Sequence, residues 1–294
     1  DQDTPWRSGQ DLGGVSLNID TKIGEGTLTS TTAWRFWTWD PSNDRDFTGL
    51  QVLAKSQNPA RHTQITQELR YAGNITSKLS GVVGAFFIDQ EVKIRGTEES
   101  GNAQWRFSQS PVNYTPAGGV STPVPLARWA EPGLLEGYGI RTTAGIRSTS
   151  AAVFGQLDWA VTEQLHILPG LRYNFDKKDA SYLRETYGGL QTTDPQLLAI
   201  KRAVYSNQSF EADKDKTDFS GNITVSYKAN DKINAYVTNA KSYKPIGVNV
   251  AGLPTPAAGQ TLADLAIIKP EDVNHYEFGI KTSPFRNSIL NLTL

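Results

Sequence analysis

Hydrophobic and polar residues alternate with a period of two along much of this chain. Between residues 151 and 159, for example, Val153 and Leu157 alternate with Gln156 and Asp158. Because successive side chains of a β-strand point to opposite faces, this pattern predicts strands with one apolar and one polar face. The composition is also not that of a helical bundle, because the long Ala, Leu, Glu and Lys tracts that build helices are missing.

The predicted strands follow one another as hairpins, each closed by a short turn. Turn residues such as those of Gly24–Gly26, and Gly73 with Asn74, mark the first two closures. About ten strands are predicted in this way. They are residues 15–23 and 27–39, 63–71 and 78–92, 151–159 and 165–176, 218–228 and 232–243, and 272–282 and 288–294.

Long polar segments separate the hairpins, so short and long connections alternate along the chain. The long segments are residues 40–62, 93–148, 178–214 and 244–270. Long loops are uncommon in compact soluble domains. An outer-membrane barrel, in contrast, has short periplasmic turns and long extracellular loops. The pattern therefore predicts an all-β fold, a transmembrane antiparallel β-barrel, with a soluble sandwich or propeller carrying long loops as the alternative.

The composition changes this interpretation little but excludes several classes of protein. The 294 residues include 29 basic and 30 acidic side chains without a basic block, so we expect no nucleic-acid partner. The absence of Cys excludes disulfides and thiolate metal sites. No apolar run approaches the roughly 18 residues of a transmembrane helix, but barrel strands are only half apolar and escape such a search.

The polar faces of the predicted strands carry charged side chains such as Arg70, Asp158 and Arg172. In a membrane barrel this face lines the lumen and the apolar face meets lipid. Side chains alone fill a barrel of about eight strands, whereas about 22 strands leave a lumen that needs a plug. Many charged residues on one face therefore indicate a wide lumen that holds water or a plug.

Four segments, in order, resemble the barrel of TonB-dependent outer-membrane receptors of the kind that import ferric siderophores. They read ITQELRY with LSGVVGAFFIDQEV (65–71 and 79–92), AAVFGQLDWAVTEQLHILPGLRYNFDKKD (151–179), NAYVTNAKSYKPIGVN (234–249) and IKPEDVNHYEFGIKT (268–282). The third segment departs from the family, which usually has two glycines after the lysine, where this chain has Pro245 and Ile246. The details of that loop stay open.

The resemblance implies that residues 1–294 form part of one outer-membrane β-barrel domain, in a barrel of about 22 strands. It also implies that the N-terminal plug domain and the C-terminal strands lie outside this sequence, which begins at Asp1 rather than at Met. The expected function is energy-coupled uptake of a scarce solute across the outer membrane of a Gram-negative bacterium, most simply a ferric siderophore. A TonB-type energy-coupling protein would act through the plug.

Two other functions stay open: a passive outer-membrane porin, and a soluble β-rich module that binds glycans. We predict no enzyme and no cofactor, because the chain has no Gly-x-Ser-x-Gly, no His-Glu-x-x-His and no phosphate-binding glycine loop. His62, His166 and His275 are scattered, and we expect no metal site. His166 and His275 are predicted to face the lumen.

Arginine and tryptophan residues near the long loops are the candidates for ligand contact. Arginine pairs with anionic oxygens in a bidentate manner, and tryptophan stacks on planar groups, which suits a charged or aromatic chelate. The alternative is that the loop aromatics pack the loops on themselves. The candidates are Arg35, Trp37 and Trp39 on the predicted lumen face, and Trp105, Arg106, Tyr114, Arg128 and Trp129 in the longest loop.

Overall fold

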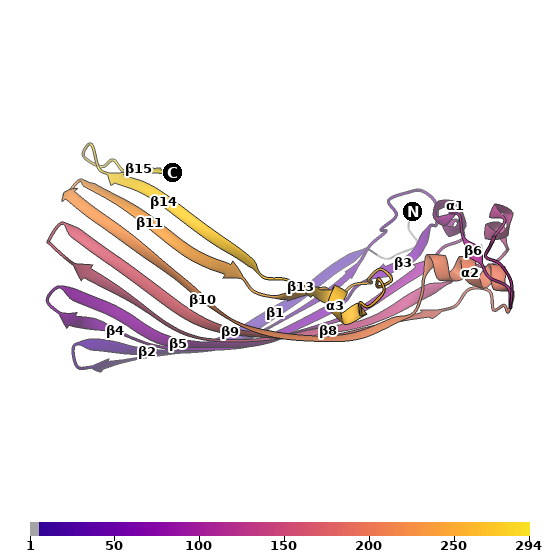
Figure 1. Ribbon diagram of the computed structural model, residues 1–294, viewed down its shortest axis with the longest axis horizontal. Coiled ribbons are helices and arrows are strands. Elements are labelled where there is room, and N and C mark those ends of the chain that lie inside the picture. Colours follow the sequence, from indigo (N-terminus) through magenta and orange to yellow (C-terminus); the bar gives the residue numbers. More distant parts are fainter. Residues whose placement is uncertain (1–5) are drawn as a thin grey trace.

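Eleven strands pair into one antiparallel sheet in the computed structural model, which describes residues 6–294 (Figure 1). They are β1 (Arg7–Ile23), β2 (Gly26–Ser42), β3 (Leu53–Gln57), β4 (Ala60–Thr76), β5 (Leu79–Ser100), β8 (Gly139–Ala160), β9 (Leu165–Tyr187), β10 (Gln208–Asn230), β11 (Ile233–Lys244), β14 (Glu271–Thr282) and β15 (Leu290–Thr293). β3 and β4 both lie between β2 and β5, and the other strands of the sheet pair with each other in the order of the chain. The five predicted hairpins are therefore confirmed.

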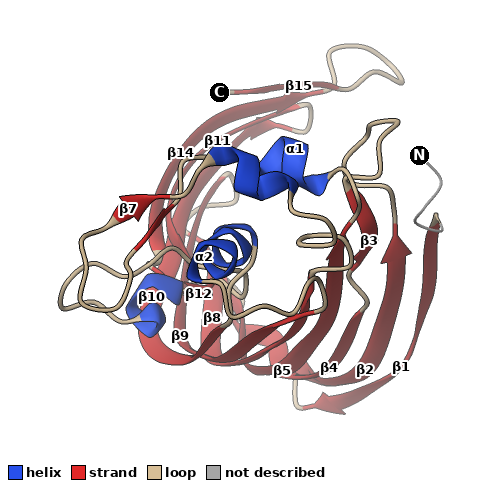
Figure 2. Ribbon diagram, turned by 90° about the vertical axis from the view of Figure 1, so that its right-hand side faces the viewer, coloured by secondary structure: helices blue, strands red, loops and turns tan. Residues whose placement is uncertain are grey.

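The sheet curls so that its concave face surrounds the loops of one end (Figure 2). Within residues 6–294, β1 is hydrogen-bonded only to β2 and β15 only to β14, so each lies at one edge of the sheet. The short turns gather at one end of the long strands and the long connections at the other (Figure 1). This is the arrangement that the alternation of connections predicts.

The convex face carries a band of exposed apolar side chains near the short turns. Soluble proteins rarely expose apolar surface over such a distance, whereas the outer face of a membrane barrel is apolar. The expectation of a transmembrane β-barrel sheet is confirmed. The band includes Val15, Leu17, Ile19, Trp34, Ile65, Leu69, Val83, Phe87, Val153, Leu157, Leu171, Tyr173, Phe175, Phe219, Ile223, Val225 and Val237.

Most strands extend further toward the long connections than the sequence predicts. Residues 93–100 belong to β5, residues 139–148 to β8, and residues 178–187 and 208–214 to β9 and β10. The prediction failed there because the convex face changes from apolar to charged while pairing continues. In β9 the convex positions read Tyr173 and Phe175 and then Lys177 and Asp179, so the apolar alternation ends long before the strand does.

The remaining parts of the long connections contain short elements rather than irregular chain. Residues 101–138 include α1 (Gln104–Ser108), β6 (Asn113–Tyr114), β7 (Thr122–Pro123) and the 3-10 helix η1 (Leu126–Ala130). Residues 188–207 include α2 (Pro195–Val204), and residues 245–270 include β12 (Gly247–Val248), α3 (Leu262–Ala266) and β13 (Ile267–Ile268). None of the helices in residues 6–294 has the length and apolar character that crossing a bilayer requires.

Aromatic rings cover glycines inside the strands and help to fix the register. A Cβ on Gly84 of β5 would lie 2.6 Å from the Phe154 ring of β8 and 2.8 Å from the Leu69 carbonyl oxygen. Gly26 is covered in the same way by Tyr71, whose hydroxyl donates to the Ile23 carbonyl. The turn predicted at Gly73 is wrong, because β4 continues to Thr76 with Gly73 paired to Gly26 and Gly81.

Candidate ligand-binding site

Polar side chains line the concave face of the sheet, as the alternation predicts for a lumen. On β9 this face carries Arg172, Asn174 and Asp176 near the apolar band. The same alternation continues through β9 to Tyr182 and Arg184 at the end with the long connections. The concave face of β9 therefore carries polar side chains from the level of the apolar band up to the long connections.

Two of the long connections pack against each other and form one apolar cluster, here called the loop core. Its buried members come from residues 124–138 and from α2. They are Val124, Trp129, Leu134, Leu135, Tyr138, Leu197 and Ile200. Because both connections contribute, neither can be displaced alone without exposing apolar surface to water.

Lys201 of α2 is buried beside the loop core, where its ammonium group replaces water contacts with backbone contacts. Its Nζ donates to the carbonyl oxygens of Gly188 and Leu190 at 3.1 and 3.0 Å, and lies 4.5 Å from the centroid of the Tyr138 ring. Burial lowers the pKa of Lys201 from its usual value. Gly188 and Gly189 have positive φ angles of 69° and 62°, so this lysine holds a tight turn against α2.

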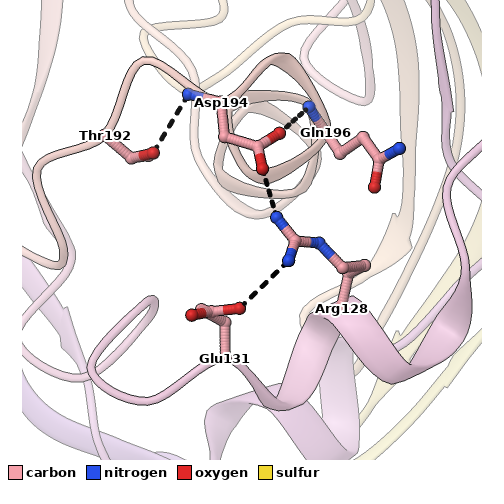
Figure 3. Close-up of polar contacts among 5 residues, drawn as sticks. All are labelled: Arg128, Glu131, Thr192, Asp194 and Gln196. Carbon is pink, nitrogen blue, oxygen red and sulfur yellow. Dashed lines mark hydrogen bonds and ion pairs between the residues drawn. The ribbon is translucent and has the colours of Figure 1, made fainter.

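Arg128 joins the two connections through charged contacts (Figure 3). Its guanidinium donates to Glu131 in its own connection at 3.3 Å and to Asp194 at the start of α2. Asp194 also caps α2, because its Oδ1 accepts from the Gln196 N–H at 2.8 Å. The dashed contacts in Figure 3 therefore run from η1 to the first turn of α2.

The five loop residues predicted to contact ligand lie in or beside the loop core. Trp129 is 1% exposed and belongs to the core itself, while Trp105 and Tyr114 pack against it half-buried. Arg106 stacks over the Trp105 ring at 5.3 Å, and Arg128 makes the contacts just described. In this structure the loop aromatics therefore pack on the loops themselves, which is the alternative to ligand contact given in the sequence analysis.

The last long connection, residues 245–270, folds inward and covers part of the lumen wall. Val248 and Ala266 pack on a concave apolar patch that includes Ala144, Tyr182 and Phe210. The Gln208 side chain holds the Leu253 backbone through two hydrogen bonds, of 2.8 and 2.9 Å. The connection is thereby fixed on the inner side of β9 and β10.

A cavity of about 660 Å³ remains between the inward connection, the loop core and the lumen wall. We call it the vestibule pocket. Its lining combines aromatic and charged side chains from β2, β5, β9 and the connections, which are otherwise distant in sequence. These side chains are Trp39, Arg45, Glu98, Tyr182, Arg184 and Tyr205.

The vestibule pocket is lined by two guanidinium groups and one carboxylate, so one positive charge has no acidic partner in its lining. Arg45 pairs with Glu98, and Arg184 donates from Nε to the Ser206 carbonyl at 2.8 Å and from Nη2 to the Ser206 hydroxyl at 3.2 Å. Burial and the nearby Glu98 carboxylate raise the pKa of Tyr205 to about 12. The phenol is therefore a neutral donor at physiological pH, beside two cations.

The structure separates the three strand residues predicted to contact ligand. Trp39 lines the vestibule pocket, whereas Arg35 and Trp37 line a second cavity of about 610 Å³ together with His62 and Gln64. The two indole rings stack on each other, with centroids 6.0 Å apart, and Trp39 donates to the Ser8 hydroxyl at 2.9 Å. Ligand contact by any of the eight candidates stays a prediction.

Sequence reasoning missed the other members of the vestibule pocket. Arg45 and Tyr205 lie in connections, and Tyr182, Arg184 and Glu98 lie in strand extensions that read as loop. A usable signal exists in β9, where the polar positions 172, 174 and 176 continue in step to 182 and 184. No comparable signal in the sequence shows which connection folds inward.

The histidines lie on polar contacts rather than at a metal centre. His166 contacts Asp158 at 2.6 Å and His275 contacts Glu277 at 3.2 Å, and the strand register places both on the concave face, as predicted. His62 contacts Gln90 at 3.3 Å. Within residues 6–294, no group of three or more His, Asp or Glu side chains is arranged to hold a metal ion.

Comparisons with known proteins give one family and several solved structures. The family model for the β-barrel of TonB-dependent receptor-like proteins matches residues 1–294. The ferric yersiniabactin uptake receptor FyuA from Yersinia pestis has a TM-score of 0.67 at 16% identity, over 97% of this chain and 35% of that one. The siderophore receptor PiuA from Acinetobacter baumannii gives 0.57 at 16% identity, over 97% and 39%.

The import receptor for ferric catecholates, Fiu from E. coli K12, gives a TM-score of 0.56 at 13% identity, over 97% of this chain and 40% of that one. This chain thus spans well under half the length of each of these receptors. At such identities the likeness concerns the fold. No curated protein matches the sequence.

Proposed function

Because this chain belongs to the TonB-dependent receptor β-barrel family, we propose that it forms the ligand-binding wall of an outer-membrane receptor for energy-coupled uptake of a ferric siderophore. The observation that carries the proposal is the vestibule pocket, which lies on the lumen side among the long connections. The proposed location is the outer membrane of a Gram-negative bacterium, with the long connections outside the cell. The family is one of receptors, and we propose no enzymatic activity.

The chemistry of the vestibule pocket favours an anionic ligand with planar groups. Arg184 and Arg45 supply guanidinium groups, which bind carboxylate and phenolate oxygens through paired N–H donors. Trp39 supplies a ring face for stacking. A cavity of about 660 Å³ is within the range of small-molecule sites.

In the proposed mechanism the vestibule pocket captures the chelate from the medium, and a plug outside residues 1–294 closes the lumen behind it. A TonB-type energy-coupling protein then pulls on the plug and opens the path. No bond of the ligand is made or broken by this chain. The direction of transport comes from the energy of the pull, because a passive lumen would only equilibrate the solute.

A passive porin would need no such coupling, and a soluble glycan-binding module would need no membrane. Family membership favours the receptor over both. The exposed apolar band on the convex face supports a membrane location and weighs against the soluble module.

The proposal is tested by iron uptake in cells that express the full-length protein, with and without their TonB-type protein. We expect uptake of at least one ferric siderophore that stops when the coupling protein is deleted. Uptake that continues unchanged without it would overturn the receptor in favour of a porin.

The site is tested separately by titrating purified full-length protein with ferric siderophores and following tryptophan fluorescence. Arg184→Gln removes a charge from the vestibule pocket, and we expect roughly a tenfold or greater loss of affinity. Arg147→Gln is the matched control, because Arg147 lies on the convex face and pairs with Asp89 at 3.0 Å. Equal affinities for both variants would move the binding site elsewhere.

A further inference from the structure

A further cavity, of about 490 Å³, lies between α2, the outer end of β9 and the residues that lead into β10. We call it the α2 pocket. It shares only Tyr205 with the vestibule pocket, so the two cavities are separate. α2 itself lies within the curl of the sheet (Figure 2). The polar lining of the α2 pocket includes Thr186, Gln191, Lys201, Arg202, Ser206 and Asn207.

The α2 pocket carries two positive charges and no negative charge. Lys201 and Arg202 line it, and none of its lining residues is Asp or Glu. The C-terminal end of a helix favours nearby cations, but its dipole amounts to only about half an elementary charge. More than one positive charge in the lining is therefore left without a counter-charge.

Lys201 is buried beside this cavity without an acidic partner. The residue is 9% exposed, and its ammonium donates to two uncharged carbonyl oxygens, those of Gly188 and Leu190. Within residues 6–294 it makes no ion pair with a carboxylate. Burying a charge is costly unless an opposite charge compensates it. The position of Lys201 therefore favours an anion in the cavity that it lines.

Arg202 adds a guanidinium that no other group of the described chain engages. The residue is exposed, and within residues 6–294 its guanidinium makes no hydrogen bond or ion pair. Its N–H donors are therefore free for a ligand, and a guanidinium binds phosphate oxygens through paired donors. The Glu99 carboxylate contacts the Tyr187 hydroxyl at 2.9 Å, but it also lies 3.8 Å from the Lys55 ammonium and is compensated there.

Neutral donors complete the lining of the α2 pocket. The Oδ1 atom of Asn207 accepts from the Thr186 N–H and hydroxyl, at 2.7 and 3.0 Å, so the amide N–H groups of Asn207 are left for another partner. The Ser206 hydroxyl accepts from Arg184 at 3.2 Å and keeps its own proton to donate. Cations combined with amide and hydroxyl donors suit the oxygens of a phosphate group.

We propose that the α2 pocket binds a phosphate group, either as inorganic phosphate or as the phosphate of a small sugar. The two cations match the charge of the phosphate, and the neutral donors match its oxygens. The cavity, at about 490 Å³, is within the range of small-molecule sites, so a sugar can accompany the phosphate. The bound ligand joins the end of α2 to the end of β9. This inference concerns a second site and does not depend on the function proposed above.

The test titrates the full-length protein in detergent by isothermal calorimetry, at constant ionic strength, with inorganic phosphate, glucose 6-phosphate and glucose. Tighter binding of glucose 6-phosphate than of phosphate would identify a sugar phosphate as the ligand. Equal or tighter binding of inorganic phosphate would identify the free ion. Binding of neither phosphate compound would overturn the proposal. So would binding of glucose as tight as that of glucose 6-phosphate.

Arg202→Gln is the test variant, because it removes the free guanidinium and leaves Lys201 and its turn in place. We expect roughly a tenfold or greater loss of affinity for the phosphate compounds, typical of a lost hydrogen bond to a charged group. Arg61→Gln is the matched control: Arg61 is also exposed and makes no hydrogen bond or ion pair within residues 6–294, but it lies on β4 outside the cavity. Wild-type affinity in Arg202→Gln, or an equal loss in both variants, would overturn the proposal.

Asn207→Asp tests the cavity itself. The substitution keeps an oxygen acceptor for Thr186 and places a negative charge in the lining, so we again expect roughly a tenfold or greater loss. Unchanged phosphate affinity in this variant would contradict the assignment. The folding of each variant is checked by its thermal transition in circular dichroism.

Ferric-siderophore binding is measured in parallel to keep the two sites distinct. It should be unchanged in Arg202→Gln, since Arg202 does not line the vestibule pocket. Equal losses of siderophore and phosphate affinity in this variant would mean one shared site and would overturn the separate phosphate site. Failure of phosphate binding alone leaves the proposed function standing.

Discussion

Arg128 and Asp194 lie 66 residues apart in sequence, yet the guanidinium of one donates to the carboxylate of the other. The contact joins η1 to the start of α2, where Asp194 is also the N-cap (Figure 3). One carboxylate therefore both begins a helix and fixes it to another connection. The two roles are separable by substitution.

Asp194→Asn should keep the cap and lose the ion pair, because asparagine caps helices about as well as aspartate. Asp194→Ala should lose both, and we expect a further cost of about 1 kcal/mol for the cap. The ion pair is one-third exposed, at 33% and 36%, and contributes at most a few tenths of a kcal/mol after solvent screening. Amide hydrogen exchange over residues 196–204 measures both changes. Equal exchange in the two variants would refute the separate capping role.

Trp129→Ala should open the loop core without unfolding the sheet. The side chain is 1% exposed, and removing a buried tryptophan costs about 3–5 kcal/mol. We expect proteolysis within residues 101–138 and 188–207 to accelerate while the thermal transition of the barrel stays in place. Phe107→Ala is the control in the same connection, because Phe107 is 56% exposed and should be neutral.

A second substitution, Trp129→Phe, separates packing from ligand contact. If Trp129 acts through the loop core, siderophore affinity and proteolysis should change together. A loss of affinity with unchanged proteolysis would instead mean that the indole contacts the ligand directly.

The sequence predicted the membrane-facing half of the sheet well and the outer half poorly, for one physical reason. Where Val153, Tyr173 and Phe175 face lipid, period-two alternation is a direct consequence of the surroundings. Further along β9, Lys177 and Asp179 face water while Tyr182 faces the concave apolar patch. Apolar side chains are then no longer confined to the convex face, so the apolar-polar alternation stops marking the strand, although the backbone pairing continues.

The candidate site was predicted in residue type but hardly in residue identity. Of the eight residues proposed from the sequence, Trp39 lines the vestibule pocket, while Trp129 fills the loop core. Sequence patterns distinguish strand faces, but the packing of one connection against another depends on contacts between residues such as Arg128 and Asp194. No local period encodes such contacts.

Gly84→Ala should destabilise the sheet, because the new methyl group would meet both Phe154 and the Leu69 carbonyl below 3.0 Å. Displacing the Phe154 ring would also disturb Arg172, which lies over it at 5.6 Å. We expect a loss of about 1–3 kcal/mol, typical of overpacking, in urea unfolding of the detergent-solubilised protein. Gly155→Ala is the matched control, since its nearest neighbour would lie at 3.4 Å. An equal loss at Gly155 would point to a general demand for glycine in the strands.

The inward connection should loosen in acid through Asp264. Its Oδ2 accepts from the Thr261 N–H at 2.9 Å and from the Thr261 hydroxyl at 2.7 Å, while the Asp264 N–H donates back to that hydroxyl at 3.1 Å. The backbone and side-chain donors of Thr261 hold the pKa of Asp264 below its usual value. A depressed carboxyl pKa stabilises the folded state above the unfolded pKa of about 3.9, and this stabilisation is lost as the pH falls through the folded pKa.

Near neutral pH, Asp264 stays ionised, so amide exchange over residues 262–266 should follow only the intrinsic pH dependence of exchange. Below about pH 4, protonation of Asp264 should add a local opening that speeds exchange over the same residues. Asp264→Asn supplies the control, because its amide cannot titrate and its opening should show no such acid dependence. Val248 and Ala266 share one apolar patch, so the opening should extend to residues 247–248. An acid-induced opening of the same size in Asp264→Asn would show that another group governs this connection.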